Sequence, residues 1–164
     1  MNNKKSYIIV AFYLFMKICV ISDSHGDRDI IRKIYNQNLN CDIYLHLGDS
    51  QLDESLIYPF VGVRGNCDYF SDLPAFKIIT TPYGKIYLEH GHIHKMVTVS
   101  FLRKYDCKIY LYGHTHIKKV DKIDEYYFFN PGSVSLPRDG DEGTYLILEL
   151  DQDKIKYEFK KVEG

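Results

Sequence analysis

The chain has 164 residues, 45% of them hydrophobic, and its 21 Lys and Arg nearly balance its 22 Asp and Glu, for a formal net charge of −1. A single domain of this size can bury a sufficient core without disulfides or a structural metal. The near-neutral charge argues against a protein that binds nucleic acid or an anionic membrane through bulk electrostatics.

The N-terminal residues 1–15 contain two lysines and then a short apolar run. This resembles the beginning of a signal peptide, but no small-residue cleavage site follows and the run is too short to cross a bilayer. We interpret residues 1–15 as an N-terminal extension, or Met16 as the functional start, and residues 16–164 as a single domain. An export signal is the alternative interpretation.

The first half of the domain predicts strands and a crossover helix. Residues 17–22 form a β-branched run typical of a buried strand. Residues 27–39 place apolar side chains at helical spacing, with Asp27 available as the N-cap. A second strand is expected over 42–49 and a third after Pro59. This order predicts a largely parallel sheet.

The second half predicts mostly antiparallel structure. Apolar residues alternate with charged ones near the C-terminus, as in a half-exposed strand. The elements expected are a hairpin over 75–92 turning at 81–84, a helix over 95–105, a strand over 107–114, a second hairpin over 118–133, and paired strands over 143–151 and 154–162. We therefore expect one α/β domain with an antiparallel second half.

The cysteines are scattered along the chain and form no CxxC pair. Four separated thiols in a chain that is large enough to fold without disulfide bonds are typical of a reducing compartment. We therefore expect a cytoplasmic protein without disulfides. Cys19, Cys41 and Cys107 are interpreted as small core residues.

Two histidines, His114 and His116, follow the strand that begins at Cys107. Residues two apart on extended backbone point to the same side, so both imidazoles would face one point if the strand geometry continued. Asp23 and His25 follow the first strand with the same spacing. Such pairs suit the binding of one or two metal ions.

Further candidate ligands stand where the other predicted strands end, which is where sites assemble in open α/β sheets. The complete set is Asp23, His25, Asp49, Asn66, His90, His114 and His116. Seven ligands are too many for one ion and suit two ions that share a bridging carboxylate. Imidazole, carboxylate and amide donors without thiolate favour borderline metals such as Mn²⁺, Fe²⁺, Zn²⁺ or Ni²⁺ over Ca²⁺. Mn²⁺ is the ion that we expect first, with Ni²⁺, Zn²⁺, Fe²⁺ or Co²⁺ as alternatives.

The ordered motifs DSH, GD, GNCD, HGH and GHTH, followed by NPGSVSLPR, resemble those of the calcineurin-like metallophosphoesterases, specifically their small bacterial and archaeal phosphodiesterase branch. The resemblance runs from Met16 to about residue 160. It implies a four-layer αββα sandwich of two mixed β-sheets flanked by helices, with a dinuclear metal site at one edge.

The resemblance also implies roles for the candidate ligands. Asp23, His25 and His116 would hold one metal, Asn66, His90 and His114 the other, and Asp49 would bridge them. The implied reaction is hydrolysis of a phosphodiester by in-line attack of a hydroxide shared by the two ions. The residues expected to act in catalysis are Asp49, Asn66, Cys67 and His90.

Cys67 departs from the wider superfamily, in which many larger members have His after the Asn, where it can protonate the leaving group. The small branch shares this Cys. A thiol is a poorer acid than an imidazolium at neutral pH. We therefore expect good activity on diesters with good leaving groups and weak activity on alkyl monoesters.

Other polar residues flank the motifs. We expect His46 to be buried or to lie behind the ligands, Asp68 to orient its loop, and His94 to be exposed to solvent, while His92 is a weaker candidate for substrate contact. Arg64 and Arg138 either contact the substrate phosphate or are ordinary surface residues, and the turn at 130–133 is expected to line the pocket.

Two alternatives to a small-molecule phosphodiesterase stay open. A nuclease of the same superfamily would need a basic track, which the balanced charge disfavours. A protein-interaction scaffold is the second alternative, because the retromer scaffold subunit resembles this fold but has lost part of the ligand set. The substrate and any homo-oligomer are beyond what the motifs indicate.

Overall fold

The computed structural model describes residues 14–140 and 142–163, and residues 1–13 of the predicted extension lie outside this range. The helices are α2 (Arg28–Gln37), α3 (Glu54–Ile57) and α4 (Val99–Lys104). The strands are β1 (Phe15–Ile21), β2 (Ile43–His46), β3 (Val61–Gly62), β4 (Phe76–Thr81), β5 (Gly84–Glu89), β6 (Cys107–Leu111), β7 (Lys118–Ile123), β8 (Tyr126–Pro131), β9 (Thr144–Asp151) and β10 (Ile155–Lys161).

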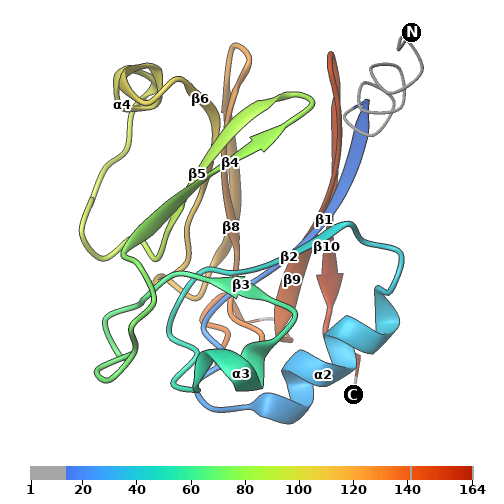
Figure 1. The fold of residues 1–164 in the computed structure, drawn as a ribbon, viewed down its shortest axis with the longest axis vertical. Coiled ribbons are helices and arrows are strands. Elements are labelled where there is room, and N and C mark those ends of the chain that lie inside the picture. The colour runs from blue at the N-terminus through green and yellow to red at the C-terminus, as the bar shows by residue number, and fades with distance from the viewer. Residues whose placement is uncertain (1–13, 141, 164) are drawn as a thin grey trace, which may run out of the picture.

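The strands form two mixed five-stranded sheets that pack face to face (Figure 1). The first sheet has the order β10-β9-β1-β2-β3, and the second has the order β4-β5-β6-β8-β7. β1, β2 and β3 run parallel to one another, as do β5, β6 and β8. The carboxyl ends of these parallel strands carry the candidate ligands.

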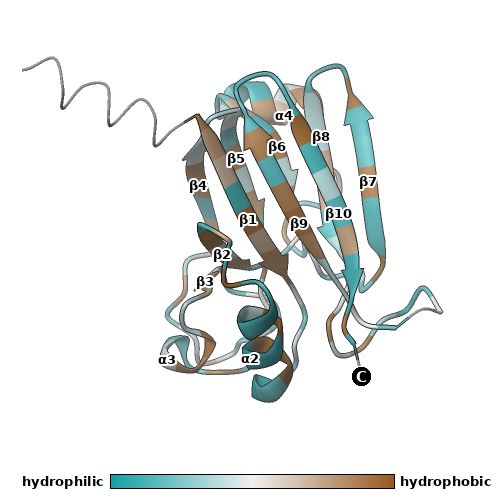
Figure 2. Ribbon diagram, turned by 90° about the vertical axis from the view of Figure 1, so that its right-hand side faces the viewer, coloured by the Kyte–Doolittle hydropathy of each residue, from teal (hydrophilic) through white to brown (hydrophobic). Residues whose placement is uncertain are grey.

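The main core lies between the sheets and is built from the long hydrophobic runs, whereas the edge strand β7 is mostly hydrophilic (Figure 2). α2 and α3 cover the outer face of the first sheet, and α4 covers the outer face of the second. The expected αββα sandwich is therefore confirmed. The central core residues include Ile18, Val20, Leu45, Leu47, Leu88, Ile109, Leu111, Phe129, Leu146 and Leu148.

The N-cap residues determine where α2 and α4 begin. The Asp27 carboxylate accepts a hydrogen bond from the Ile30 N–H at 3.0 Å, which confirms the predicted start of α2. α4 is shorter than expected, because the Thr98 hydroxyl accepts from the Phe101 N–H and starts the helix there rather than at Lys95. The single turn of α3 was not predicted.

Two strand boundaries also differ from expectation. The strand after Pro59 is only two residues long, since the chain leaves β3 to form the loop that carries Asn66. β1 begins at Phe15, which pairs with Asp151, two residues before the strand expected from Lys17.

All four cysteines are free, and Cys19, Cys41 and Cys107 are buried as expected. None of the helices in the described part of the chain is long and apolar enough to cross a membrane.

Candidate metal centre

Four predicted ligands from four different strand ends converge in the structure. The Asp23 Oδ1 atom lies 3.1 Å from His116 Nε2 and 3.8 Å from His90 Nε2. The Asp49 Oδ2 atom lies 3.3 Å from His90 Nε2. Asp23, Asp49, His90 and His116 are all buried. The topology therefore brings together side chains that are up to 93 positions apart in the sequence, from Asp23 to His116.

Three histidines of this cluster are oriented in the same way. His25 Nδ1 lies 2.8 Å from Gln51 Oε1, and the Nδ1 atoms of His90 and His116 each lie 2.7 Å from a backbone carbonyl oxygen. Because these oxygens accept hydrogen bonds, each Nδ1 carries a proton, and in the neutral ring each Nε2 presents a lone pair to the cluster. An outer oxygen that fixes the imidazole in this way is typical of metal-binding histidines.

The inward-facing atoms fit a cation. Asp23 Oδ1 and His90 Nε2 are buried and have no hydrogen-bond partner among the described residues. Carboxylate oxygens that face imidazole lone pairs repel one another, and buried polar atoms without partners are strongly unfavourable. A divalent cation between them would satisfy the carboxylates and imidazoles together.

The donor atoms form overlapping groups. Asp23, His25 and His116 form one group, and Asp23, Asp49 and His90 form another, with the donor atoms of each within 4.8 Å of one another. A third group joins His25, Asp49 and Cys67 within the same limit. Overlapping groups of this kind can accommodate two neighbouring ions.

Asn66 and His114 lie at the rim of the cluster, and both are exposed. The Asn66 amide contacts the Cys67 sulfur at 3.5 Å. The His114 ring centroid is 5.2 Å from that of His90. The structure thus groups five predicted ligands, of which Asp23, Asp49, His90 and His116 are buried and His25 is half-buried, and places these two beside them.

The backbone reason that we gave for the histidine pair is wrong. β6 ends at Leu111, and His114 and His116 have φ angles of 69° and 59°, in the left-handed region. Asp23 and His25 have φ angles of 55° and 45°. His114 therefore lies beside His90, whereas His116 lies beside Asp23. Tight turns, and not extended backbone, deliver these side chains.

Positive φ angles are concentrated at the centre. Eight described non-glycine residues have them, and six belong to the ligand loops: Asp23, His25, Asp49, Gln51, His114 and His116. Such conformations are unfavourable for residues with a Cβ and persist where the surrounding structure holds them.

Asp49 is held as a carboxylate. Burial would raise its pKa, but the contact with the His90 ring in its protonated form and the hydrogen bond from the Cys67 N–H, at 2.7 Å to Oδ1, lower the pKa well below its usual value. Asp49 is therefore ionised at neutral pH, as a metal ligand must be.

His46 and Asp68 lie behind the centre as predicted. His46 is completely buried, and this burial lowers its pKa to about 4, so the ring is neutral. It accepts from the Gly48 N–H and bonds to the Ser24 hydroxyl, which ties the loop after β1 to the loop after β2. The Asp68 carboxylate accepts from the N–H groups of Asp49, Gly65 and Gln51 at 2.7–2.8 Å.

Asp68→Asn is expected to weaken Mn²⁺ binding by about 10- to 100-fold, the usual effect of losing an outer partner of a metal ligand. An amide has one acceptor oxygen and would turn its NH₂ group toward donors. Calorimetric titration of metal-stripped protein measures the change. Asp72→Asn, on the same loop but exposed, serves as the control and should bind Mn²⁺ like the original protein. Equal affinities for both variants would contradict this role of Asp68.

His94 corrects an expectation. It is half-buried, and its Nδ1 lies 2.9 Å from Glu89 Oε2 rather than in solvent. Glu89 is buried and also accepts from the Tyr110 hydroxyl at 2.6 Å. His92 lies beside the centre, with its ring centroid 5.5 Å from that of His90.

The turn at 130–133 does not line a pocket, because it is buried behind the centre. The Asn130 amide donates to the Gly113 carbonyl, and the Ser133 hydroxyl donates to the Asp23 carbonyl. It therefore braces two ligand loops.

Arg138 is exposed, and its backbone N–H donates to the His116 carbonyl, which places it next to the centre. Arg64 is also exposed, and a phosphate contact by either arginine stays a prediction.

Some residues of the centre carried no signal in the sequence. Gln51 orients His25, and the Ser22 hydroxyl donates to Asp23 Oδ2 at 2.5 Å. Neither belongs to a recognisable spacing pattern.

Residues 16–153 match the family model described as the calcineurin-like phosphoesterase superfamily domain. The chain belongs to this superfamily. A probable metallophosphoesterase of Bacillus subtilis (strain 168), YsnB, is 31% identical over 158 residues, which cover 91% of this chain and 93% of the relative. The resemblance inferred from the motifs is therefore confirmed.

Two further proteins are informative. The crystal structure of a predicted phosphoesterase from Streptococcus pneumoniae TIGR4 superposes with a TM-score of 0.82 at 30% identity and covers 90% of each chain. Phosphodiesterase YfcE of Escherichia coli (strain K12) is 35% identical over 99 residues, which cover 56% of this chain and 53% of the relative. The fold and the hydrolase family are thus shared with bacterial phosphoesterases.

Proposed function

We propose that this protein is a dinuclear metal-dependent phosphodiesterase. The observation that carries the proposal is the buried cluster in which Asp23 Oδ1 and His90 Nε2 lie 3.8 Å apart and neither makes a hydrogen bond within the described residues. Two divalent cations, with Mn²⁺ expected first, would be held by Asp23, His25 and His116 on one side and by Asn66, His90 and His114 on the other, with Asp49 between them. The four free thiols support a cytoplasmic location.

When bound, the two cations would stabilise charge on the phosphoryl oxygens and supply a hydroxide at neutral pH for in-line attack on phosphorus. The protein's own side chains orient the site. Gln51 fixes the His25 ring, and the Asp68 carboxylate holds the backbone of Asp49. Arg138, beside His116, can bind a phosphate oxygen.

Cys67 stands at the leaving-group side implied by the motif, with its sulfur within 4.8 Å of the donor atoms of His25 and Asp49. Burial and the neighbouring Asp49 raise the pKa of this thiol. It stays protonated at neutral pH but is a weak proton donor, so the leaving group must depart largely unaided.

The Mn²⁺-loaded protein is therefore expected to hydrolyse bis(p-nitrophenyl) phosphate at least about 100-fold faster than an alkyl phosphate monoester, the contribution usual for a general acid. Absorbance and released phosphate measure the two rates in one preparation. Faster hydrolysis of the alkyl monoester would show that Cys67 is not a weak proton donor to the leaving group, as assigned here.

The scaffold alternative is disfavoured because every ligand position carries a side chain able to bind a metal. It predicts a folded protein with no turnover of any phosphodiester in the presence of divalent metals.

A further inference from the structure

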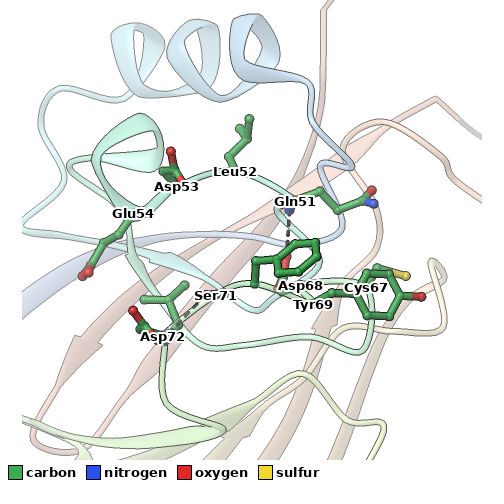
Figure 3. A pocket seen from close by; sticks show the side chains of 11 residues that line it. Gln51, Leu52, Asp53, Glu54, Cys67, Asp68, Tyr69, Ser71 and Asp72 are labelled. Atoms are coloured by element: carbon green, nitrogen blue, oxygen red, sulfur yellow. Dashed lines mark hydrogen bonds between the residues drawn. The ribbon is translucent and has the colours of Figure 1, made fainter.

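A pocket of about 460 Å³ lies beside the candidate metal centre, between residues 51–54 and residues 67–73 (Figure 3). Two of its lining residues contact the ligands directly. Gln51 Oε1 lies 2.8 Å from His25 Nδ1, and the Cys67 N–H donates to Asp49 Oδ1 at 2.7 Å. A group bound in this pocket would therefore be adjacent to a phosphate at the centre.

Two aromatic side chains that line this pocket are exposed to solvent. Tyr69 is 79% exposed and Phe70 is fully exposed, and both follow Cys67 in the same loop. Adjacent exposed aromatic rings offer flat faces to a ligand and are typical of binding sites rather than of a stable surface.

The charge of the pocket has one sign. Asp53, Glu54 and Asp72 are exposed carboxylates, and Figure 3 places them on the side away from Cys67. None of the 11 lining residues, all within the described chain, is Lys, Arg or His. A second phosphate or a carboxylate on the substrate would be repelled here, whereas a cation would be attracted.

We propose that this pocket binds one alcohol group of the phosphodiester and selects an alcohol that carries an ammonium group. This inference rests on the proposed phosphodiesterase function and names its substrate class. The phosphate would lie at the metal centre, and the ammonium group would lie against the faces of Tyr69 and Phe70, with the three carboxylates lining the far side of the same pocket. Aromatic faces combined with negative charge are the recognised chemistry for binding quaternary ammonium groups.

Three methyl phosphodiesters, whose alkoxide leaving groups make hydrolysis slow, serve as binding probes for the full chain loaded with Mn²⁺. They are the choline ester, the neutral neohexyl ester, in which carbon replaces the nitrogen, and the anionic glycolate ester. Calorimetry is expected to show the choline ester binding about tenfold tighter than the neohexyl ester, and the glycolate ester binding weakest.

Substitutions in the pocket test whether its carboxylates and aromatic rings cause the preference for the choline ester over the neohexyl ester. The triple change Asp53→Asn, Glu54→Gln and Asp72→Asn keeps side-chain shape and is expected to reduce the choline preference to about twofold or less. Phe70→Leu should weaken the choline ester more than the neohexyl ester. Asp29→Asn, an exposed carboxylate on α2 outside the pocket, should leave the preference unchanged.

Turnover of bis(p-nitrophenyl) phosphate in the same preparation separates the two proposals. If the protein turns over bis(p-nitrophenyl) phosphate, three binding results would each overturn the assignment of the pocket but not the phosphodiesterase. These are equal binding of the choline and neohexyl esters, tightest binding of the glycolate ester, and no binding of any ester. A choline preference without any turnover would instead overturn the phosphodiesterase, and with it the assignment of the pocket to a substrate alcohol.

Discussion

Asp49→Asn is expected to lower the Mn²⁺-dependent hydrolysis of bis(p-nitrophenyl) phosphate by about a thousandfold or more, because metal ions supply several kcal/mol of transition-state stabilisation. Asp49 belongs to two of the donor groups and is the carboxylate assigned to bridge the ions. An amide has no negative charge to hold two cations together. Its oxygen can still accept from the Cys67 N–H, so the loop itself should survive.

The measurement compares kcat/KM of the variant with that of the original protein after metal removal and addition of Mn²⁺. Circular dichroism checks that the variant is folded. Asp29→Asn is the matched control, since it removes a carboxylate that is exposed, lies on α2 and belongs to none of the donor groups. A folded Asp49→Asn protein with more than about a tenth of the original activity would show that Asp49 does not bridge the metals.

Gly65→Ala is the second change with a large expected effect. A Cβ at this position would overlap the Asp49 Oδ1 atom and backbone nitrogen, and would lie 2.8 Å from Asp49 Cγ. Asp49 cannot move aside easily, because its N–H is bonded to the buried Asp68 carboxylate. We expect a loss of about 1–3 kcal/mol in the free energy of unfolding, the usual result of overpacking, together with loss of Mn²⁺ binding and turnover.

Gly140→Ala controls for the loss of a glycine. Gly140 has a φ of 75°, but a Cβ there would meet nothing within 4 Å. It should lose about 1 kcal/mol from backbone strain and keep its activity. Thermal unfolding and Mn²⁺ titration of both variants decide the question. If Gly65→Ala binds Mn²⁺ as tightly as Gly140→Ala, the close packing of Gly65 on Asp49 does not position the metal site.

The sequence was sufficient for most of the strands and for grouping candidate ligands, while the two-sheet sandwich followed from the family resemblance. Buried β-branched runs such as that ending at Ile21 indicated strands, and the Asp27 cap indicated α2. Each ligand stood directly after such a run, so the convergence of parallel strand ends was enough to group Asp23, Asp49 and His90.

The local geometry was not predictable in the same way. The positive φ angles of His114 and His116 arise from hydrogen bonds made across the chain, such as that from the His114 N–H to Asp23 Oδ2 at 3.1 Å. The partnership of Glu89 with His94 and Tyr110 depends on sheet register and a loop path. Neither kind of contact leaves a periodic pattern in the sequence.

Stepwise addition of Mn²⁺ to chelator-stripped protein, while hydrolysis of bis(p-nitrophenyl) phosphate is followed, tests whether catalysis needs two metal ions. We predict no turnover without metal, and a rate that rises until two equivalents are bound and then stays constant. A stripped and folded protein that remains inactive with Mn²⁺, Ni²⁺, Co²⁺, Fe²⁺ and Zn²⁺ alike, or one that is active without any metal, would contradict the account.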